Sequence, residues 1–205
     1  DYRTSGHNNN IIKGPEFITV FDGMTGAALA TEPFSPARGD VKSWGDSYGN
    51  RANRMLGTIA YVDGKLPSAV FCRGYYKRTA MTAWNWRNGK LTKAWEFDTK
   101  NSGNKKFENE GNHSSQVGDV DGDGKDEIVY GSSTIDHNGK GLYALDLGHG
   151  DAGNLGDIDP QRPGLEYFGV HEEYDNGRHL HDAKTGEMIW HKKHKGDNGR
   201  GAVCD

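Results

Sequence analysis

The sequence predicts an all-β protein built from four-stranded antiparallel units, the architecture of a β-propeller. Three observations favour this fold. Of the 205 residues, 30 are glycine and only 33% are hydrophobic, a composition that suits short strands joined by many turns. An acidic loop that leads directly into a strand occurs twice. These loops alternate with hairpins, in which a strand, a glycine turn and a returning strand follow one another.

The hairpins and loops can be placed in chain order. Strand-like runs at 18–22, 82–86, 142–146 and 179–182 each lead to a glycine turn and a returning strand. Together with the acidic loops they define three repeats, roughly at 51–100, 111–150 and 151–200, with partial repeats at both ends. Repeats of about this length with four strands each are typical of propeller blades.

Three repeats do not decide how the propeller would close into a ring. Because propellers close with about 4–8 blades, we expect residues 1–205 to be a portion of one larger propeller domain, or a four-bladed ring in which the end fragments pair. The segment Gly201–Asp205 resembles Ser115–Asp119 and would begin a further repeat. A plain antiparallel sandwich is the alternative, since strand counts alone do not separate these folds.

The first acidic loop, Asp119–Glu127, predicts a calcium site. Its carboxylates stand at positions 1, 3, 5 and 9, and the carbonyl of the residue at position 7 supplies a further oxygen. Calcium takes about 6–8 oxygen ligands in irregular geometry, so it fits this loop better than zinc or magnesium. The expected ligands are Asp119, Asp121, Asp123, Lys125 and Glu127. A metal-free acidic turn is the alternative, but carboxylates at this spacing would repel one another without a cation.

A second acidic loop repeats the pattern with a variation. The run Gly118–Asp121 recurs as Gly156–Asp159, and Glu166 follows one residue later than Glu127 does in the first loop. We expect Asp157, Asp159 and Glu166 to form a variant calcium site. Loops of this kind fill reliably where calcium is millimolar, which predicts an extracellular, secreted protein, although no signal peptide is visible in this chain.

Composition and cysteine usage exclude several classes of function. A formal net charge of −4 gives no general attraction to nucleic acid or to an anionic membrane. No apolar run approaches the ~20 residues of a membrane span. Cys72 and Cys204 do not make a disulfide framework. Two buried free thiols are expected, with a bridge between them as the alternative.

Polar residues stand where the repeats join, which in a propeller is an end face. Equivalent junction loops from successive blades converge around the central channel. These residues are therefore expected to form one site although they are distant in sequence: His113, His149, Asp151, Glu172 and Arg200. Taken singly, each has an ordinary alternative, such as a structural histidine or a solvated carboxylate beside another one.

Cations and aromatic side chains cluster in Arg73–Arg78. Tyr75 and Tyr76 would stack on a sugar ring, and neighbouring cations such as Arg73 and Lys77 would pair with its carboxylate. The alternative is that both tyrosines are sheet residues and that Arg73 makes a structural salt bridge.

Taken together, these features resemble the rhamnogalacturonan lyases of polysaccharide lyase family 11, calcium-rich eight-bladed propellers that cleave the pectin backbone. The matching segments cover nearly the whole chain, and their combination is more specific than the acidic loop alone. A full lyase of this family is far longer, so the chain resembles a central portion of one. The segments are Phe21–Gly26, Asn53–Leu56, Arg73–Arg78, Trp84–Lys90, His113–Asp123, Gly148–Asp151 and His171–Tyr174.

The resemblance implies a calcium-dependent lyase that cleaves rhamnogalacturonan I by β-elimination at galacturonosyl residues. It implies an active-site calcium held by His113, His149, Asp151 and Glu172, apart from the calciums of the acidic loops. The implied partner is an acidic plant cell-wall polysaccharide, and the full-length protein is expected to be a monomer. The alternative is a non-catalytic calcium-binding propeller module that binds carbohydrate or protein.

The β-elimination also needs a base that removes the proton at C5, beside the C6 carboxylate of the sugar. Among the residues of this chain, Arg200 is the first candidate, and Lys77 or Arg73 is the next. A guanidinium is a poor proton acceptor. Arg200 would then orient the carboxylate through paired hydrogen bonds, with the base lying outside this chain.

Overall fold

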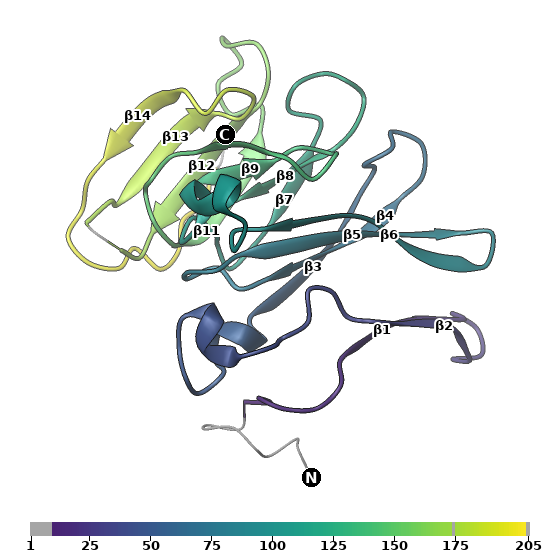
Figure 1. The fold of residues 1–205 in the computed structure, drawn as a ribbon. Coiled ribbons are helices and arrows are strands. Elements are labelled where there is room, and N and C mark those ends of the chain that lie inside the picture. The colour runs from purple at the N-terminus through teal and green to yellow at the C-terminus, as the bar shows by residue number, and fades with distance from the viewer. Residues whose placement is uncertain (1–9, 174, 204–205) are drawn as a thin grey trace.

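The computed structural model describes residues 10–173 and 175–203 (Figure 1). Its strands form one two-stranded sheet and three four-stranded sheets, and every strand pair is antiparallel. Apart from three short 3-10 helices, no helix occurs in the described part of the chain. The predicted all-β class and the four-stranded antiparallel units are therefore confirmed. None of the described helices is long and apolar enough to cross a membrane.

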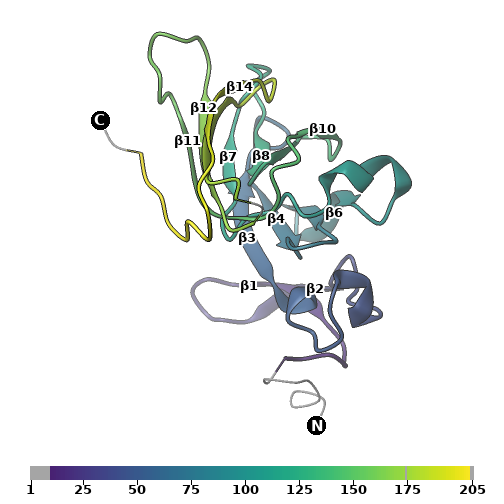
Figure 2. The same cartoon turned by 90° about the vertical axis from the view of Figure 1, so that its left-hand side faces the viewer.

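The N-terminal part is a hairpin followed by two 3-10 helices. Strand β1 (Phe17–Phe21) pairs with β2 (Ala28–Pro33), and η3 (Val41–Trp44) and η4 (Arg51–Asn53) lead on to the first large sheet. The hairpin turns at Gly26, whose φ of +72° favours glycine. Side chains of the hairpin pack on one face of that sheet, where Ile18 meets Trp84 and Leu91. Figure 2 shows the hairpin below the three sheets.

The three large sheets each consist of four strands that are consecutive in the chain. The first contains β3 (Met55–Ala60), β4 (Ser68–Arg73), β5 (Ala80–Arg87) and β6 (Lys90–Asp98). After η5 (Ser102–Phe107), the second contains β7 (Gln116–Gly118), β8 (Glu127–Tyr130), β9 (Ser133–Ile135) and β10 (Gly141–Ala144). The third contains β11 (Gly150–Gly156), β12 (Glu166–His171), β13 (Arg178–Asp182) and β14 (Met188–Lys192). Each sheet is thus a meander, in which strands that are consecutive in the chain pair with one another.

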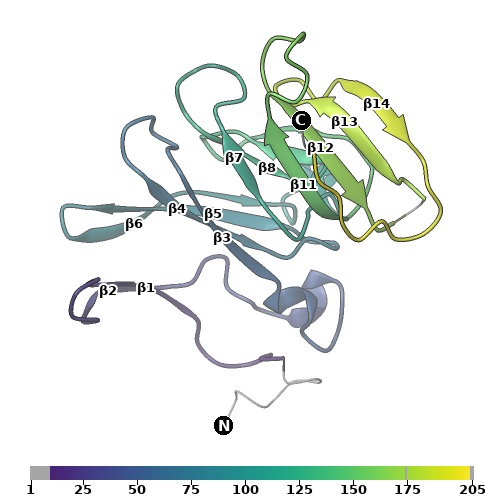
Figure 3. The same cartoon turned by 180° about the vertical axis from the view of Figure 1, so that it is seen from behind.

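The sheets follow one another in space as they do in the chain. Strand β7, the first of the second sheet, contacts both β3 and β11, the first strands of its neighbours. Figure 3 shows these three first strands side by side, with the outer strands β6 and β14 on opposite sides. Within the described residues the sheets make an open succession and no sheet closes on itself.

The two interfaces between the sheets differ in chemistry. The first and second sheets are joined by a large apolar cluster that includes Met81, Phe97, Ile128 and Tyr130. Cys72 belongs to it as a free thiol, and burial raises its pKa to about 12. Cys204 lies outside the described residues. The segment Gly201–Asp205, which was expected to begin a further repeat, is described only as far as Val203.

The second and third sheets share a smaller apolar group, which contains Val129, Tyr167 and Ala183. Next to this group lie the fully buried rings of His179 and His181. The first interface is mainly apolar and is crossed by a few hydrogen bonds, such as that from the Tyr130 hydroxyl to the carbonyl of Gly74. The second interface also buries polar rings, which need hydrogen-bond partners.

Candidate metal centre

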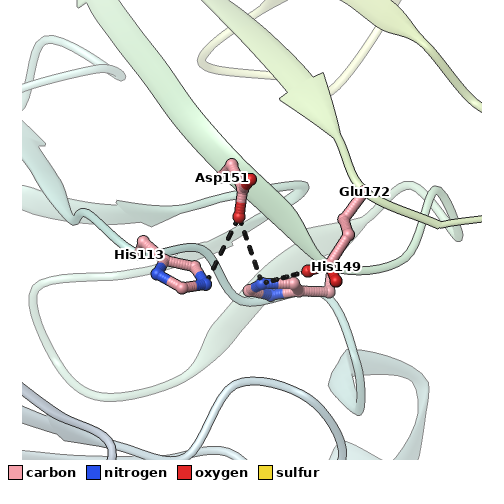
Figure 4. A group of neighbouring side chains, drawn as sticks. All are labelled: His113, His149, Asp151 and Glu172. Carbon is pink, nitrogen blue, oxygen red and sulfur yellow. Dashed lines mark ion pairs between the residues drawn. The ribbon is translucent and has the colours of Figure 1, made fainter. Parts of the chain in front are cut away.

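Four side chains from three junctions meet at one end of the sheets, as Figure 4 shows. His113 precedes β7, His149 and Asp151 lie at the start of β11, and Glu172 directly follows β12. A parallel bridge between Asn112 and Gly150 joins the first two junctions. Glu172 belongs to the third junction, and its amide donates to the carbonyl of His149 at 3.1 Å, so this junction is joined to the other two.

The ligand atoms of these four residues all lie within 4.8 Å of one another. His113 Nε2 is 3.3 Å from Asp151 Oδ1, and His149 Nε2 is 3.8 Å from the same oxygen. Glu172 Oε2 lies 3.4 Å from His149 Nε2. The structure thus brings together four of the five junction residues that the sequence singled out, in a spacing that suits one shared cation.

His149 offers the most direct evidence for a ligand. Its Nδ1 lies 2.7 Å from the carbonyl of Gly111, which can only accept, so Nδ1 carries the hydrogen. Nε2 therefore presents a lone pair, and it is buried without a hydrogen-bond partner. Burial lowers the pKa of His149 to about 4, so the ring is neutral near pH 7. A neutral lone pair that faces two carboxylates is repulsive unless a cation lies between them.

The two carboxylates are also perturbed by their surroundings. Burial is the main cause that raises the pKa of Asp151, and it raises the pKa of Glu172 with further help from the charge of Asp151. Two imidazole nitrogens and two carboxylates form a donor set that fits a divalent cation.

Aromatic rings support the two histidines. Tyr75 stacks on His149 with ring centroids 4.9 Å apart and planes 9° apart. Tyr76 also contacts His149, and its hydroxyl lies 3.4 Å from His113 Nε2. Only 3% of Tyr75 is exposed, so its ring is packed beneath His149 and is not open to a sugar. Tyr76 is half-buried and keeps part of its surface accessible.

The three candidate bases have different surroundings. Arg200 is exposed, and its Nη1 lies 4.0 Å from Asp151 Oδ2 at the edge of the four-residue group. Lys77 is exposed and follows Tyr76 directly in the chain. Arg73 does not reach the site: only 1% of it is exposed, and its guanidinium donates to both oxygens of Glu16 at 2.8 and 2.9 Å. A buried cation that is fully paired cannot accept a proton from a substrate.

The first acidic loop folds around Asp119. Its Oδ1 accepts from the amides of Gly122 and Asp123, and its Oδ2 accepts from that of Gly124. Glu127 is fully buried, and one of its oxygens accepts from the Val120 amide while the other has no partner. Ligand atoms of Asp119, Asp121 and Glu127 lie within 4.8 Å of one another, a second group of donors suited to a cation.

Asp123 lies in a neighbouring group with Glu127 and His137. The ammonium of Lys125 donates to Asp123 Oδ2 at 3.0 Å and so occupies part of that carboxylate. His137 Nδ1 lies 3.5 Å from both Asp123 Oδ2 and Glu127 Oε1. His137 was not singled out from the sequence, because it lies ten residues beyond Glu127 and reaches the loop only through the turn after β9.

The second acidic loop is less compact. Glu166 is fully buried and accepts from the amides of Ile158 and Asp159, both at 2.9 Å, and its other oxygen has no partner. Asp157 is exposed. Within residues 10–173 and 175–203, Asp157, Asp159 and Glu166 are not among the groups whose donors gather within 4.8 Å. This variant loop therefore resembles the first in its buried glutamate and differs in its aspartates.

Two further cations near the centre were not singled out from the sequence as site residues. The Arg51 guanidinium lies over the Tyr76 ring at 5.3 Å from its centroid. The charge of Arg54 lowers the pKa values of His113 and His149, although burial is the larger cause for both. Arg51 begins the 3-10 helix η4 and Arg54 directly follows it, and sequence periodicity does not reveal this helix. They add positive charge beside a site that already holds two carboxylates.

Comparisons with known proteins agree on one family. The family model described as rhamnogalacturonan lyase family 11, C-terminal domain, matches residues 1–205. The chain is similar to the rhamnogalacturonan endolyase YesW and the rhamnogalacturonan exolyase YesX of Bacillus subtilis (strain 168), with 51% identity to each. The matches include 100% of this chain and 33% of each relative, so the chain spans about a third of the length of these relatives.

Solved structures give the same picture. The crystal structure of YesW superposes on 98% of this chain with a TM-score of 0.93, and the match covers 34% of that protein. A rhamnogalacturonan lyase of Bacillus licheniformis is 54% identical, also with a TM-score of 0.93, over 98% of this chain and 34% of its own. Because the family model and both relatives span the whole sequence at this level of identity, the chain belongs to rhamnogalacturonan lyase family 11.

Proposed function

We propose that the chain is part of a calcium-dependent polysaccharide lyase that cleaves the rhamnogalacturonan I backbone by β-elimination at galacturonosyl residues. The relatives that carry lyase names are about three times as long as this chain. The proposal therefore concerns the full-length protein, to which this chain contributes the candidate metal centre. An acidic plant cell-wall polysaccharide is the proposed substrate, and an extracellular location with millimolar calcium is the proposed setting.

The observation that carries the proposal is the buried, unpartnered Nε2 of His149, which faces the carboxylates of Asp151 and Glu172. His113 completes the group from the opposite side. A bound divalent cation would neutralise a substrate carboxylate and favour loss of the proton on the adjacent carbon. These four residues would hold such a cation, and calcium is the proposed ion.

The residues of the chain would divide the remaining work between binding and proton transfer. Arg200 is exposed beside Asp151 and would pair with the substrate carboxylate through two parallel hydrogen bonds. Lys77 is then the candidate for the base within this chain, because a lysine gives up its proton more readily than an arginine. Arg200 stays a candidate for the base only where another group pairs with the carboxylate. Tyr76 would contact the sugar with the part of its ring that stays accessible.

The fold supports a related proposal. The three four-stranded meanders, with their first strands side by side, suit consecutive blades of a propeller. Residues 1–205 would then be one portion of a propeller domain, and calcium in the acidic loops would stiffen its blades. We further propose that the full-length protein is a monomer.

The test is an assay for the C4–C5 unsaturated product, which absorbs ultraviolet light, with the full-length protein and rhamnogalacturonan I. The protein is assayed with calcium, with a chelator, and after reloading with calcium, manganese or zinc. Glu172→Gln removes one proposed ligand charge. Glu173→Gln is the matched control, because the adjacent Glu173 accepts from Asn109 Nδ2 and does not belong to the four-residue group.

We expect calcium-dependent formation of product that Glu172→Gln abolishes and Glu173→Gln leaves unchanged. Restoration by manganese or zinc but not by calcium would support the lyase and reject calcium at this centre. Equal effects of the two substitutions would reject the centre. If the folded, calcium-loaded protein forms no product, the non-catalytic binding module becomes the better description, and calorimetry with the polysaccharide then measures binding directly.

A further inference from the structure

Three histidine rings form a continuous hydrogen-bonded line in the interface between the second and third sheets. His171 Nε2 lies 2.8 Å from His179 Nδ1, and His179 Nε2 lies 2.9 Å from His181 Nδ1. The three rings, called here the histidine row, are at most 2% exposed. The rings of His179 and His181 are almost parallel, with planes 3° apart. None of the proposed chemistry above uses them.

The end of the histidine row at Gly148 fixes its direction. His171 Nδ1 lies 3.2 Å from the carbonyl of Gly148, which can only accept, so His171 carries its hydrogen on Nδ1. Its Nε2 must then accept from His179 Nδ1, and His179 Nε2 must accept from His181 Nδ1. All three rings are thus neutral Nδ1–H tautomers. At the far end the Tyr143 hydroxyl, 3.0 Å from His181 Nε2, shares its proton between that nitrogen and the carbonyl of Ala183.

The surroundings suit neutral rings. His179 and His181 are two residues apart on β13 and so share one face of the sheet. Opposite His179, a Cβ atom on Gly169 would come within 2.6 Å of its ring, so glycine leaves the space that the ring fills. Burial lowers the pKa of His179 to about 2 and that of His181 to about 4. Asp182 and His191 are the other titratable groups that influence these pKa values.

The His171 end of the histidine row involves two residues that are next in sequence to proposed metal ligands. The carbonyl that anchors His171 belongs to Gly148, the residue before His149. His171 itself is the residue before Glu172. The backbone on either side is held as well: the amide of Glu172 donates to the carbonyl of His149, and the amide of Asn198 donates to that of His171.

The row does not conduct protons into the centre. It ends on a backbone carbonyl, which accepts a hydrogen bond and has no hydrogen to pass on. Its effect on the centre must therefore be mechanical, through the positions of two residues that are covalently joined to proposed ligands. Hydrogen bonds made by the groups behind metal ligands commonly set the orientation of those ligands.

We propose that the histidine row is a positioning element that holds the backbone at Gly148 and His171, and so sets His149 and Glu172 at the distance of one shared cation. This inference rests on the metal centre proposed above. It makes His171, His179, His181 and Tyr143 positioning residues, none of which touches the cation or the substrate.

The test measures tautomers and cation affinity in the full-length protein. Ring nitrogen shifts of selectively 15N-labelled histidines report the tautomers directly. Calcium calorimetry reports affinity, and the heat that disappears in Glu172→Gln identifies binding at this centre. Tyr143→Phe removes the hydroxyl at the far end and keeps the ring, and His179→Leu breaks the row in the middle. Thr82→Val is the matched control, because it deletes another buried hydroxyl that donates to a carbonyl, in the first sheet.

We expect three Nδ1–H tautomers, and a loss of calcium affinity at this centre of about tenfold or more in Tyr143→Phe and His179→Leu. Affinity at the Asp119–Glu127 loop stays unchanged, and Thr82→Val affects neither site. Unchanged affinity in both row variants, or Nε2–H tautomers, would overturn the positioning role while leaving the metal centre intact. If Glu172→Gln removes no heat, the centre itself is rejected and the row's role with it. Should His179→Leu not fold, Tyr143→Phe and the tautomers decide.

Discussion

Glu127→Gln gives the sharpest test of calcium in the first acidic loop, because its effect should change sign with the cation. Glu127 is fully buried and one of its oxygens has no partner. Burial, with the nearby charges of Asp121 and Asp123, raises its pKa from 4.5 to about 7. Without a cation, the folded state therefore holds this proton more tightly than the unfolded chain does. Stability is lost as pH rises from about 4.5 through 7.

The size of the effect follows from the pKa. At about 1.4 kcal/mol per pKa unit, the rise corresponds to roughly 3 kcal/mol that opposes folding above pH 7. Glutamine removes the charge, but it leaves a buried amide N–H₂ unsatisfied, which costs about 1–3 kcal/mol. In chelator at pH 8 the variant should thus be as stable as the wild type or more stable, by up to about 2 kcal/mol.

Calcium reverses the comparison, because the wild-type carboxylate then has its partner. A ligand at about 100 times its dissociation constant stabilises the folded state by about 2.7 kcal/mol. The assay is thermal unfolding of the full-length wild type and variant, each with millimolar calcium and with chelator. About 1 kcal/mol corresponds to roughly 2–4 °C in Tm for a unit of about 150–250 residues and to less in a longer one. The rise in Tm on adding calcium should therefore be smaller in the variant than in the wild type. An equal rise in both proteins would refute calcium binding through Glu127.

Three further predictions concern stability. Glu16→Gln leaves two buried arginines without their shared counterion and should lower the free energy of unfolding by about 3–5 kcal/mol. Glu96→Gln breaks an exposed ion pair and should lower it by under about 1 kcal/mol. Similar Tm values for the two variants would contradict this expectation. Gly64→Ala should lower the Tm and weaken calcium binding, because Gly64 has a φ of +69° and a Cβ there would lie 2.6 Å from the Gly124 carbonyl in the acidic loop; calorimetry and thermal unfolding check both effects, and unchanged values would refute the contact. In the folded protein the histidines of the row have pKa values below the ordinary 6.5. Their contribution to stability is therefore full above about pH 6.5 and is lost as the pH falls toward 4. If the Tm of the wild type falls no more than that of His179→Leu between pH 7 and 4.5, the rings are not neutral in the folded protein.

The parts of the protein that depend on local sequence were predictable. Strand and turn patterns act over a few residues, so the four-stranded antiparallel units followed from glycine turns and alternating loops. The Asp119–Glu127 loop is equally local, since its donors stand within nine residues. The spacing alone indicates which carboxylates can meet, although it did not indicate that His137 would join them.

The junction residues needed an assumption about fold before they could be grouped. His113 precedes the second sheet and Glu172 follows a strand of the third, and they meet only because the first strands of the sheets lie side by side around β7. The propeller hypothesis predicted this convergence because equivalent junctions of successive blades share an end face. Their chemistry was less predictable: the tautomer of His149 depends on one carbonyl, that of Gly111, in another junction.

By itself, the sequence determined the all-β class, the four-stranded units, the acidic loop and the family. Only the tertiary structure decided which polar residues are available for chemistry. Arg73 and Tyr75 look like ligand-binding residues in the sequence, yet packing buries the first against Glu16 and the second beneath His149. His179 and His181 look like background, yet they join the line that ends beside the candidate centre. The physical reason is that burial and hydrogen-bond partners are set by neighbouring sheets, and these contacts join residues that are far apart in the chain.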